Sequence, residues 1–364
     1  MSFAARNVLR ASRAAAPAAR LATPNNAVRF FSATRINRVQ DTANKKSVVR
    51  EKEVPVTIYD GPGQGDKSTL NVPESAARVP YDSPAPPADH DAVNPVSKKT
   101  YEALPHTMKS MSVYGKTIIV TGGARGLGNH MARACAEAGA KNIVIFDANQ
   151  ELGDQAAAEL HEKSGLPVSF FKVDVRDGAA INAAVDSVVE LYGAPDALVN
   201  AAGIADSNIK AETYDPAMFR RLIDINLTGT FLMSQAVGRA MMAAGKPGSL
   251  ILVASMSGSI VNYPQEQSCY NASKAGVIQF AKSIGAEWAK HGIRVNCISP
   301  GYMDTALNRV PALDAQKKIW RSLTPQNRLG NVDELNGLCV FLASDSSSFM
   351  TGSNVVVDGG YSLW

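Results

Sequence analysis

The chain has few of the residues on which metal centres and disulfide frameworks depend, with four cysteines and five histidines among 364 residues. The cysteines are Cys135, Cys269, Cys297 and Cys339. They form no Cys-x-x-Cys pair, and no histidine lies near them at metal-ligand spacing, so we expect no metal site. The chain also lacks a run of about twenty apolar residues, which excludes a predicted membrane span.

The first forty residues lack lysine, aspartate and glutamate, although they contain seven arginines. The rest of the chain therefore carries 30 of the 37 basic residues against 33 acidic ones, and gives no reason to expect a nucleic-acid partner. An acid-free leader rich in arginine, alanine and serine is typical of a mitochondrial transit peptide. We predict such a peptide over residues 1–38 and a location in the mitochondrial matrix. A disordered basic tail is the alternative.

Residues 39–112 lack a regular apolar period. Nine prolines, from Pro55 to Pro105, would interrupt any helix, and Gly61, Gly63 and Gly65 add conformational freedom. The sequence therefore predicts an extended, largely disordered N-terminal arm.

From Thr117 onward, apolar strands alternate with helical patterns. We expect strands at 117–120, 142–146, 168–173, 197–200, 249–254, 294–298 and 354–357, and helices at 127–138, 149–163, 178–192, 216–244, 269–290 and 332–344. Such alternation predicts an α/β fold, a Rossmann-like doubly wound parallel sheet with helices on both faces, over residues 113–364. The segment from Tyr302 to Gln326, with two prolines, is predicted to be a mobile lid.

A glycine-rich turn follows the first predicted strand, with the sequence Thr121-Gly122-Gly123-Ala124-Arg125-Gly126-Leu127-Gly128. Glycines let the backbone approach a pyrophosphate closely, and the N-terminus of the next helix presents free N–H groups to it. The turn is predicted to bind a dinucleotide through Gly122, Arg125, Gly126, Leu127 and Gly128. A tight turn whose glycines serve only positive φ angles is the alternative.

Asp147 ends the next predicted strand, 19 residues after Gly128. An acid at this point accepts hydrogen bonds from the ribose hydroxyls of the adenosine and would repel a 2′-phosphate. This favours NAD over NADP, whereas Arg125 points the other way because its charge could reach a 2′-phosphate. Asp147 could also act as the N-cap of the following helix.

Tyr270 and Lys274 lie four residues apart, and so on one face of a helix. A free tyrosine has a pKa of about 10 and is a poor base at neutral pH. An ammonium within about 4 Å would lower that value toward 7, which general acid–base chemistry requires. The sequence therefore predicts that these two residues form a proton-transfer pair.

Taken together, the chain from Val113 onward resembles the short-chain dehydrogenase/reductase family. The other matching stretches are Asp174-Val175, Asn200-Ala201-Ala202-Gly203, Asn226, Ser255, Pro300-Gly301 and Asp358-Gly359-Gly360. The resemblance implies hydride transfer between a nicotinamide and a carbinol or carbonyl carbon. It makes Tyr270 the acid–base residue, places Lys274 on the nicotinamide ribose, and places Ser255 on the substrate oxygen.

The resemblance also implies places for the remaining residues. Asp174 and Val175 would lie at the adenine edge, Asn200, Ala201 and Gly203 beneath the adenosine, and Pro300, Gly301 and Thr305 beside the nicotinamide. Asn226 would hold a water of the proton relay. The family's serine usually lies thirteen residues before the tyrosine, which is Ser257 here. We choose Ser255 because it directly follows a predicted strand and Gly258 lies three residues on; Ser257 stays the alternative.

The stretches Ser255–Gly258 and Val261–Gln267 are similar to those of fungal sugar-alcohol dehydrogenases. This similarity implies a polyol/ketose pair such as arabinitol and ribulose or xylulose, with Gln265 beside Ser255 and Tyr270 at the substrate. Amide and carboxylate groups in this loop suit polyhydroxylated substrates, although a solvated surface loop would also be polar. A mitochondrial 3-oxoacyl thioester reductase and a non-catalytic NAD-binding sensor or scaffold are the other hypotheses.

The helix from Tyr270 to Lys290 is apolar nearly all round, which predicts burial on both sides. One side would face the sheet and the other a second subunit. In the family this helix packs between subunits, so we expect a homo-oligomer, a tetramer by resemblance.

Overall fold

The computed structural model describes residues 51–58, 66–73, 92–206, 208–305 and 313–364. The chain divides into two compact units between Arg78 and Val79. The predicted transit peptide, residues 1–38, lies outside the described residues.

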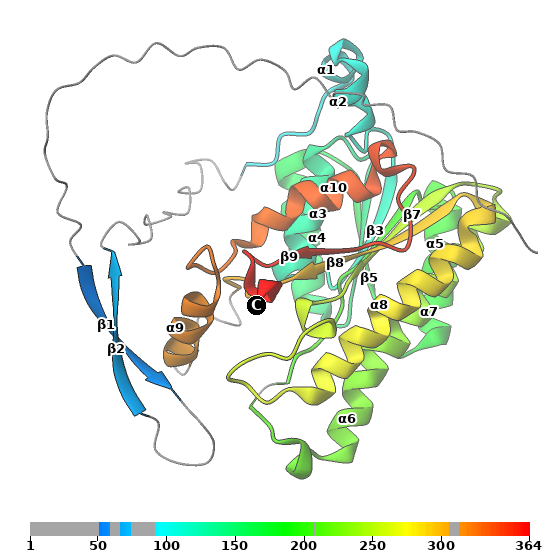
Figure 1. Ribbon diagram of the computed structural model, residues 1–364. Coiled ribbons are helices and arrows are strands. Elements are labelled where there is room, and N and C mark those ends of the chain that lie inside the picture. Colours follow the sequence, from blue (N-terminus) through cyan, green and yellow to red (C-terminus); the bar gives the residue numbers. More distant parts are fainter. Residues whose placement is uncertain (1–50, 59–65, 74–91, 207, 306–312) are drawn as a thin grey trace, which may run out of the picture. The chain divides into compact units, whose positions relative to one another are not determined.

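The first unit contains an antiparallel pair of strands, β1 (Glu51–Ile58) and β2 (Asp66–Pro73) (Figure 1). Glu51 pairs with Pro73 and Ile58 with Asp66. Regular structure is thus present within the stretch for which the sequence predicts a largely extended arm. Both strands of a two-stranded ribbon are edge strands, and an edge strand is where a proline such as Pro55 is tolerated.

The second unit is built on a parallel sheet of seven strands in the order β5-β4-β3-β6-β7-β8-β9. The strands are β3 (Thr117–Thr121), β4 (Asn142–Asp147), β5 (Val168–Lys172), β6 (Ala197–Asn200), β7 (Gly248–Val253), β8 (Ile293–Pro300) and β9 (Asn354–Val357). Chain order reverses between β3 and β6, so this pair marks the switch point at which open α/β sheets bind ligands. The predicted doubly wound α/β fold is confirmed.

Helices cover both faces of this sheet (Figure 1). The covering helices are α3 (Gly126–Glu137), α4 (Gln150–Ser164), α5 (Gly178–Tyr192), α7 (Gly229–Ala243), α8 (Ser268–Trp288) and α10 (Asn336–Ala343). Two further helices, α6 (Pro216–Ile223) and α9 (Asp314–Leu323), lie beyond the end of the sheet. The helices α3, α4 and α10 share one hydrophobic cluster with the sheet, and α5, α7 and α8 share another.

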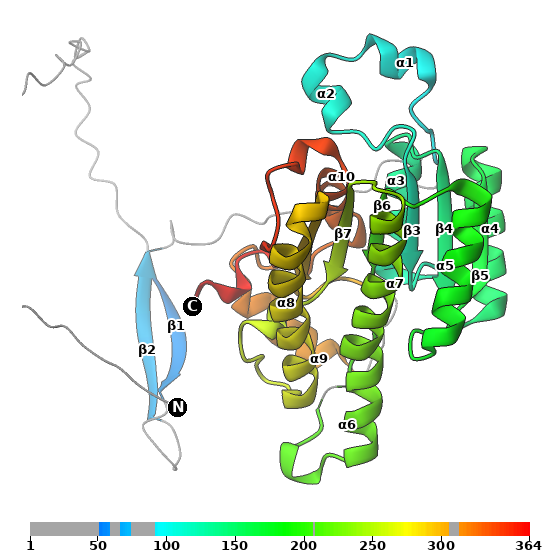
Figure 2. The same ribbon diagram turned by 90° about the vertical axis from the view of Figure 1, so that its right-hand side faces the viewer.

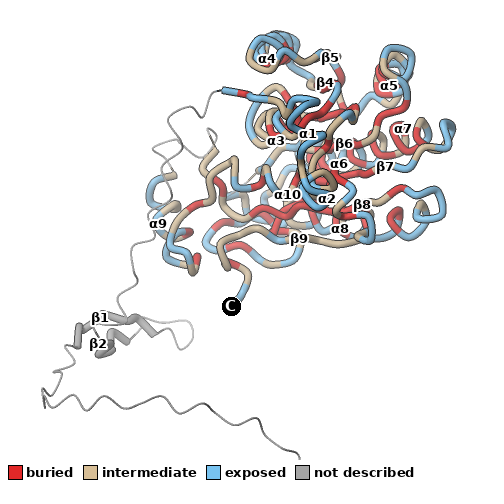
Figure 3. Tube along the Cα trace, turned by 90° about the horizontal axis from the view of Figure 1, so that it is seen from above, coloured by how far each residue is buried: buried red, intermediate tan, exposed pale blue. Residues whose placement is uncertain are grey.

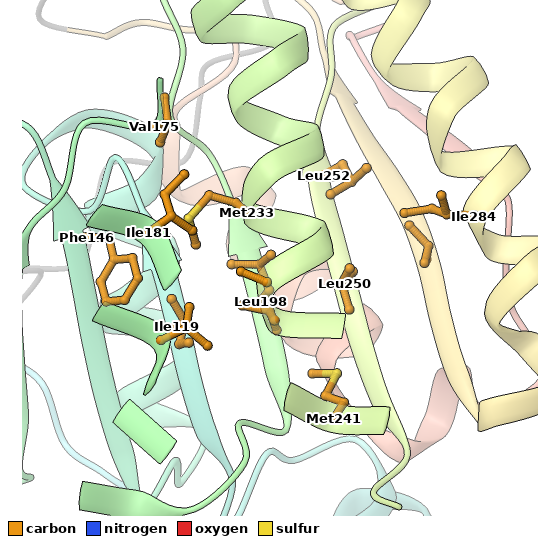
Figure 4. Packing of buried hydrophobic residues seen from close by; sticks show 14 of the residues in the cluster. Ile119, Phe146, Val175, Ile181, Leu198, Met233, Met241, Leu250, Leu252 and Ile284 are labelled. Carbon is orange, nitrogen blue, oxygen red and sulfur yellow. The ribbon is translucent and has the colours of Figure 1, made fainter. Parts of the chain in front are cut away.

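The strands are buried on both sides, so successive residues serve opposite clusters. Ile119, Leu198 and Leu250 pack toward α5, α7 and α8, as Figure 4 shows. Their neighbours Ile118 and Val199 pack toward α3, α4 and α10. Figure 3 shows the buried residues gathered along the strands and the exposed ones on the outer sides of the helices. A sheet covered in this way is held rigidly, and its strand ends are fixed supports for a site.

All strands predicted from Thr117 onward are present, with ends within two residues of the predicted ones. The predicted helix over 216–244 is instead α6, a π-helical segment at Asp224–Thr228 and α7. In Figure 2, α6 and α7 follow one another as a single column. The predicted lid contains the helix α9 between Asp314 and Leu323.

The packed unit begins before residue 113, the predicted start of the domain. Two short helices, α1 (Lys98–Ala103) and α2 (His106–Ser110), lie in the preceding stretch. Val93 is buried in one cluster with Val113, and the Val96 N–H donates to the Glu137 carbonyl at 3.0 Å. Residues from 92 onward are therefore anchored to α3 rather than extended.

Candidate active site

The ends of the central strands bring the predicted site residues to one edge of the sheet. Gly122 follows β3, Asn200 ends β6, Ser255 follows β7 and Pro300 ends β8. All these strands run parallel, so their carboxyl ends meet at the same edge. The sequence separates these residues by up to 178 positions, and the sheet brings them together.

The glycine turn between β3 and α3 fits a pyrophosphate. Gly122 has φ +64°, and a Cβ atom there would lie 2.9 Å from the Ala202 Cα. A Cβ on Gly128 would lie 2.4 Å from the Gly122 carbonyl oxygen, so both positions require glycine. Gly126 has φ +60° with open space around its missing Cβ, and among the described residues no side chain caps the N-terminus of α3. The first N–H groups of α3, beside Leu127, therefore face a space that an anion can enter.

Asp147 lies next to this turn at the end of β4. Its Oδ2 accepts a hydrogen bond from the Ala124 N–H at 3.2 Å, and its Oδ1 accepts one from the Asn149 N–H at 3.0 Å. The N-cap of α4 is Asn149, whose Oδ1 accepts from the Leu152 N–H, so the alternative role of Asp147 as the N-cap is wrong. Asp147 is half-buried and Arg125 is exposed, so the Asp147 carboxylate is the charge that is held in place beside the glycine turn.

The side chains of two predicted adenosine-side residues are bound within the protein. The carboxylate of Asp174 pairs with the guanidinium of Arg176, whose hydrogen bonds lower the pKa of that carboxyl. The Asn200 amide accepts from the Thr121 hydroxyl at 2.8 Å and donates to the Thr230 carbonyl at 3.2 Å. These side chains fix the ends of the strands and loops; Val175 is buried beside them.

Lys274 and Asn226 meet at Gly203, in the loop after β6. A Cβ on Gly203 would lie 3.2 Å from the Asn226 Oδ1 and 3.6 Å from the Lys274 Nζ. Lys274 is buried, and its ammonium donates to the Val253 carbonyl at the end of β7, at 2.8 Å. An ammonium has three protons, so two remain for other acceptors.

Asn226 lies in the π-helical segment Asp224–Thr228, and such segments are frequent at functional sites. Its amide accepts from the Ile204 N–H and donates to the Ile204 carbonyl, both at 2.9 Å, and also donates to the Ser273 hydroxyl at 3.1 Å. The amide therefore holds the loop after β6 against α8. The Asn226 carbonyl accepts from the Thr230 hydroxyl at 2.7 Å.

Ser255 and Tyr270 lie together, and the Ser255 side chain acts on the phenol as a hydrogen-bonding neighbour that lowers its pKa. Ser255 caps the 3-10 turn Met256–Gly258. This turn packs on α8 because Gly258 has no side chain; a Cβ atom there would lie 2.7 Å from the Lys274 carbonyl carbon. Ser257, the alternative serine, is buried and accepts from the Gln267 amide at 3.1 Å. The geometry thus sets Ser255, and not Ser257, beside the phenol.

Burial governs the pKa values of the pair on α8. It raises the pKa of Tyr270 above its ordinary value of 10, and the hydrogen bond from Ser255 offsets this only in part. It lowers the pKa of Lys274 to about 8, with Cys297 acting in the opposite direction. The Lys274 Nζ lies over the Tyr270 ring, 5.9 Å from its centroid, and it is not among the groups that shift the pKa of Tyr270. The expectation that Lys274 lowers the pKa of Tyr270 toward 7 is therefore wrong for the protein alone.

Pro300, Gly301 and Thr305 follow one another where β8 leaves the sheet. A Cβ on Gly301 would lie 2.6 Å from the Asp358 Cα, so the crossing of these two segments depends on glycine. The Gly301 N–H donates to the Val357 carbonyl at 2.9 Å, and the Thr305 N–H donates to the Met303 carbonyl at the same distance. This segment leaves the carboxyl edge beside the loop of Ser255.

The amide side chains predicted to bind substrate are bound to one another. Gln265 and Gln267 are buried, and the Gln265 Nε2 donates to the Gln267 Oε1 at 3.1 Å. The Gln267 Nε2 lies 2.7 Å from the Asn262 Oδ1. Gln265 also accepts from the indole of Trp320 at 2.8 Å, so its amide serves to join this loop to α9. Gln265 is thus engaged by the protein, and its predicted contact with the substrate stays a prediction.

Residues of α9 pack against the loops at the carboxyl edge of the sheet, whereas the sequence predicts only a mobile lid there. Trp320 is buried and its ring stacks on Tyr302, with 4.2 Å between centroids. Gln316 donates to Gln265 at 3.2 Å. The sequence signal that this segment is anchored is the apolar face formed by Ile319, Trp320 and Leu323 on an otherwise polar helix.

Among the described residues, no three His, Cys, Asp or Glu side chains are grouped as a metal site would require. In the same part of the chain, no helix combines the length and apolar character needed to span a bilayer.

Comparison with known proteins places the chain among oxidoreductases. The model of the family described as enoyl-(acyl carrier protein) reductase matches residues 122–362. The NADP-dependent mannitol dehydrogenase of Alternaria alternata is 42% identical over 253 residues, covering 69% of this chain and 93% of that protein. The ribulose-forming D-arabinitol 2-dehydrogenase of Candida tropicalis is 38% identical over 284 residues, covering 74% of this chain and all of that protein.

A solved structure is similar over the same region. The gluconate 5-dehydrogenase of Burkholderia cenocepacia, crystallised with NADP and tartrate, has a TM-score of 0.67 and 36% sequence identity. It covers 71% of this chain, and the match includes all of the crystallised chain.

Proposed function

The chain belongs to the short-chain dehydrogenase/reductase family, and we propose that it interconverts a polyol and a ketose by hydride transfer with a nicotinamide dinucleotide. The relatives named for arabinitol and mannitol act on such pairs. The observation that carries the proposal is the meeting of Ser255, Tyr270 and Lys274 at the carboxyl edge, next to a glycine turn shaped for a pyrophosphate.

When bound, a nicotinamide dinucleotide supplies or accepts the hydride. The residues of the glycine turn would hold its pyrophosphate, and Asp147 the adenosine ribose. The buried ammonium of Lys274 has two protons left to donate to the hydroxyls of the nicotinamide ribose.

Tyr270 holds the proton that the reaction needs in the reductive direction. Its raised pKa keeps the phenol protonated at neutral pH, so it can donate to the carbonyl oxygen of a ketose. Ser255 would hydrogen-bond the same oxygen. In the oxidative direction the phenol must first lose its proton, which burial disfavours, and we propose that ketose reduction is the faster direction at neutral pH.

If Asn226 holds a water of the proton relay, it does so through its backbone carbonyl. Its amide is occupied by Ile204 and Ser273. The carbonyl accepts one hydrogen bond from Thr230 and has a second lone pair, which a water could use.

We propose NAD as the preferred dinucleotide. The support is the position of Asp147, whose carboxylate is fixed by two backbone N–H groups and would repel a 2′-phosphate. The Alternaria relative is named as NADP-dependent, so the preference needs a direct comparison of both cofactors on this chain.

The test is a panel of substrates assayed with both nicotinamides. D-arabinitol, mannitol, ribulose, xylulose and a 3-oxoacyl thioester would each be offered to the purified protein. We expect turnover of a polyol/ketose pair, faster with NAD(H) than with NADP(H). Turnover of the thioester alone would replace the proposal by acyl reduction, and no turnover of any substrate would reject an enzymatic role.

We also propose that residues 1–38 direct the chain to the mitochondrial matrix and that the enzyme is a homotetramer. The arginine-rich, acid-free composition supports the first proposal. Mass spectrometry of the protein from isolated mitochondria would show an N-terminus near residue 38, whereas a full-length chain outside mitochondria would reject it.

A further inference from the structure

Amide side chains from three segments meet above the carboxyl edge of the sheet. Asn208 comes from the loop after β6, Gln265 from the loop before α8, and Gln316 from α9. The Asn208 and Gln316 amides bond each other in both directions, with donor–acceptor distances of 3.3 Å. The Gln316 Nε2 also donates to the Gln265 Oε1 at 3.2 Å.

The inner and outer parts of this cluster differ in strength. At the inner part, Gln265 and Trp320 are 7% and 4% exposed, and their hydrogen bond is 2.8 Å long. At the outer part, Asn208 is exposed, and both bonds to Gln316 exceed the usual range for N–H···O bonds. The inner bond therefore anchors α9, while the outer pair can exchange its bonds for others at small cost.

The cluster adjoins the N-terminal end of α8, where Tyr270 lies. The Ile209 N–H, next to Asn208, donates to the Glu266 carbonyl at 3.1 Å. The Gln267 amide donates to the Asn271 Oδ1, one residue after Tyr270, at 3.0 Å. The loop that carries Asn208 is held at its other end by the Asn226 amide.

We infer that the Asn208–Gln316 amide pair determines substrate specificity by binding hydroxyl groups of the polyol or ketose that are remote from the reacting carbon. This inference rests on the proposed function. A side-chain amide offers two donors and an acceptor, and a hydroxyl group donates and accepts, so each bond of the pair can be replaced by one to the substrate. An acyl chain offers no such groups.

The test uses one substitution at each position. Asn208 has φ +60°, which glycine adopts freely, so Asn208→Gly removes the amide without straining the backbone. Gln316→Met keeps the length of the side chain. The matched controls are Asn327→Gly, at an exposed asparagine with φ +55°, and Lys318→Met, at an exposed residue of α9.

We expect each test variant to raise the KM for the best polyol or ketose by about tenfold, with kcat within about twofold. The KM for the nicotinamide and the midpoint of thermal unfolding should not change. The two effects should be less than additive in the double variant, because both residues form one pair. The controls should match the wild-type protein.

Two results would overturn the inference while leaving the proposed function intact. One is a substrate KM within twofold of the wild-type value in both variants. The other is an equal rise in the KM values for substrate and nicotinamide with a lower unfolding midpoint, which would show that the pair only holds the loops together. If the wild-type protein turns over no polyol or ketose, the proposed function fails first and the inference fails with it.

Discussion

Tyr270 and Lys274 lie one turn apart on α8, and burial moves their pKa values in opposite directions. The pKa of Tyr270 rises and that of Lys274 falls to about 8. Burial favours the uncharged form of a group, which is the protonated form of tyrosine and the deprotonated form of lysine. Sequence spacing alone suggested attraction between a phenolate and an ammonium. In the structure, burial instead raises the pKa of the phenol, which favours its protonated form, and the Lys274 side chain is held by the Val253 carbonyl.

The lowered pKa of Lys274 predicts that this residue reduces the free energy of unfolding by an amount that depends on pH. Between its pKa in the folded protein, about 8, and its ordinary value of 10.5, the unfolded chain binds a proton that the folded chain has lost. The stability of the wild-type protein therefore rises with pH through this window. Relative to Lys274→Met, its free energy of unfolding should rise by about 2 kcal/mol between pH 7.5 and 9.5.

Urea denaturation of both proteins at the two pH values measures this difference, and the groups common to both cancel. A difference in free energy that stays constant with pH would show that Lys274 is not desolvated as the structure indicates.

At the scale of elements, the glycine turn and α3 depend on close backbone contact. Gly128→Ala would place a methyl group 2.4 Å from the Gly122 carbonyl oxygen. We expect a loss of about 1–3 kcal/mol in stability and weaker binding of the nicotinamide dinucleotide. Thermal unfolding and a fluorescence titration with the reduced cofactor measure the two effects.

The matched control lies in α10. Gly337 is exposed and nothing lies within 4 Å of its missing Cβ, so Gly337→Ala should raise stability by about 0.5–1 kcal/mol through helix propensity. Equal effects of the two substitutions would contradict the close packing of the turn.

Elements with a regular apolar period were predictable from the sequence, and those held by distant partners were not. The strands from β3 to β9 are apolar runs, which the sequence displays directly. The helix α9 is fixed by Trp320, whose hydrogen-bond partner Gln265 lies 55 residues earlier in the chain. The π-helical segment at Asp224–Thr228 inserts into a continuous helical pattern, and periodicity does not reveal such an insertion.

The same limit applies to the site. Ser255, Tyr270 and Lys274 were predictable because strand ends and helical spacing determine where they lie. The partners of Gln265, Asn200 and Asp174 were not predictable, because a polar side chain near a site can bind the protein as well as a ligand. In the structure, all three are engaged by the protein itself.

At the scale of the whole molecule, the surface of α7 and α8 tests the proposed assembly. The outer face of α8, predicted to be apolar nearly all round, also exposes the polar side chains of Gln279, Lys282 and Glu287 in the single chain. Burial of this face against a second subunit stays a prediction. An apolar patch remains where Phe231 of α7, 40% exposed, meets Phe280 of α8 with 5.9 Å between ring centroids. Such a patch suits a contact between subunits.

We expect light scattering to give the mass of a tetramer, and Phe231→Asp to shift the protein toward smaller species. Leu191→Asp, at an exposed leucine of α5, should leave the mass unchanged. A monomeric wild-type protein would contradict the proposed tetramer and would leave the proposed hydride transfer unaffected.

The central claim is that the phenol of Tyr270 transfers the proton that accompanies hydride transfer. The most direct measurement is the single-turnover rate of ketose reduction by Tyr270→Phe, followed by nicotinamide absorbance with the cofactor already bound. The variant removes only the hydroxyl, so it should fold and bind the cofactor as the wild-type protein does, and its rate should fall by about 10²–10⁴-fold. A rate within about threefold of the wild-type value, with normal folding and cofactor binding, would contradict the claim.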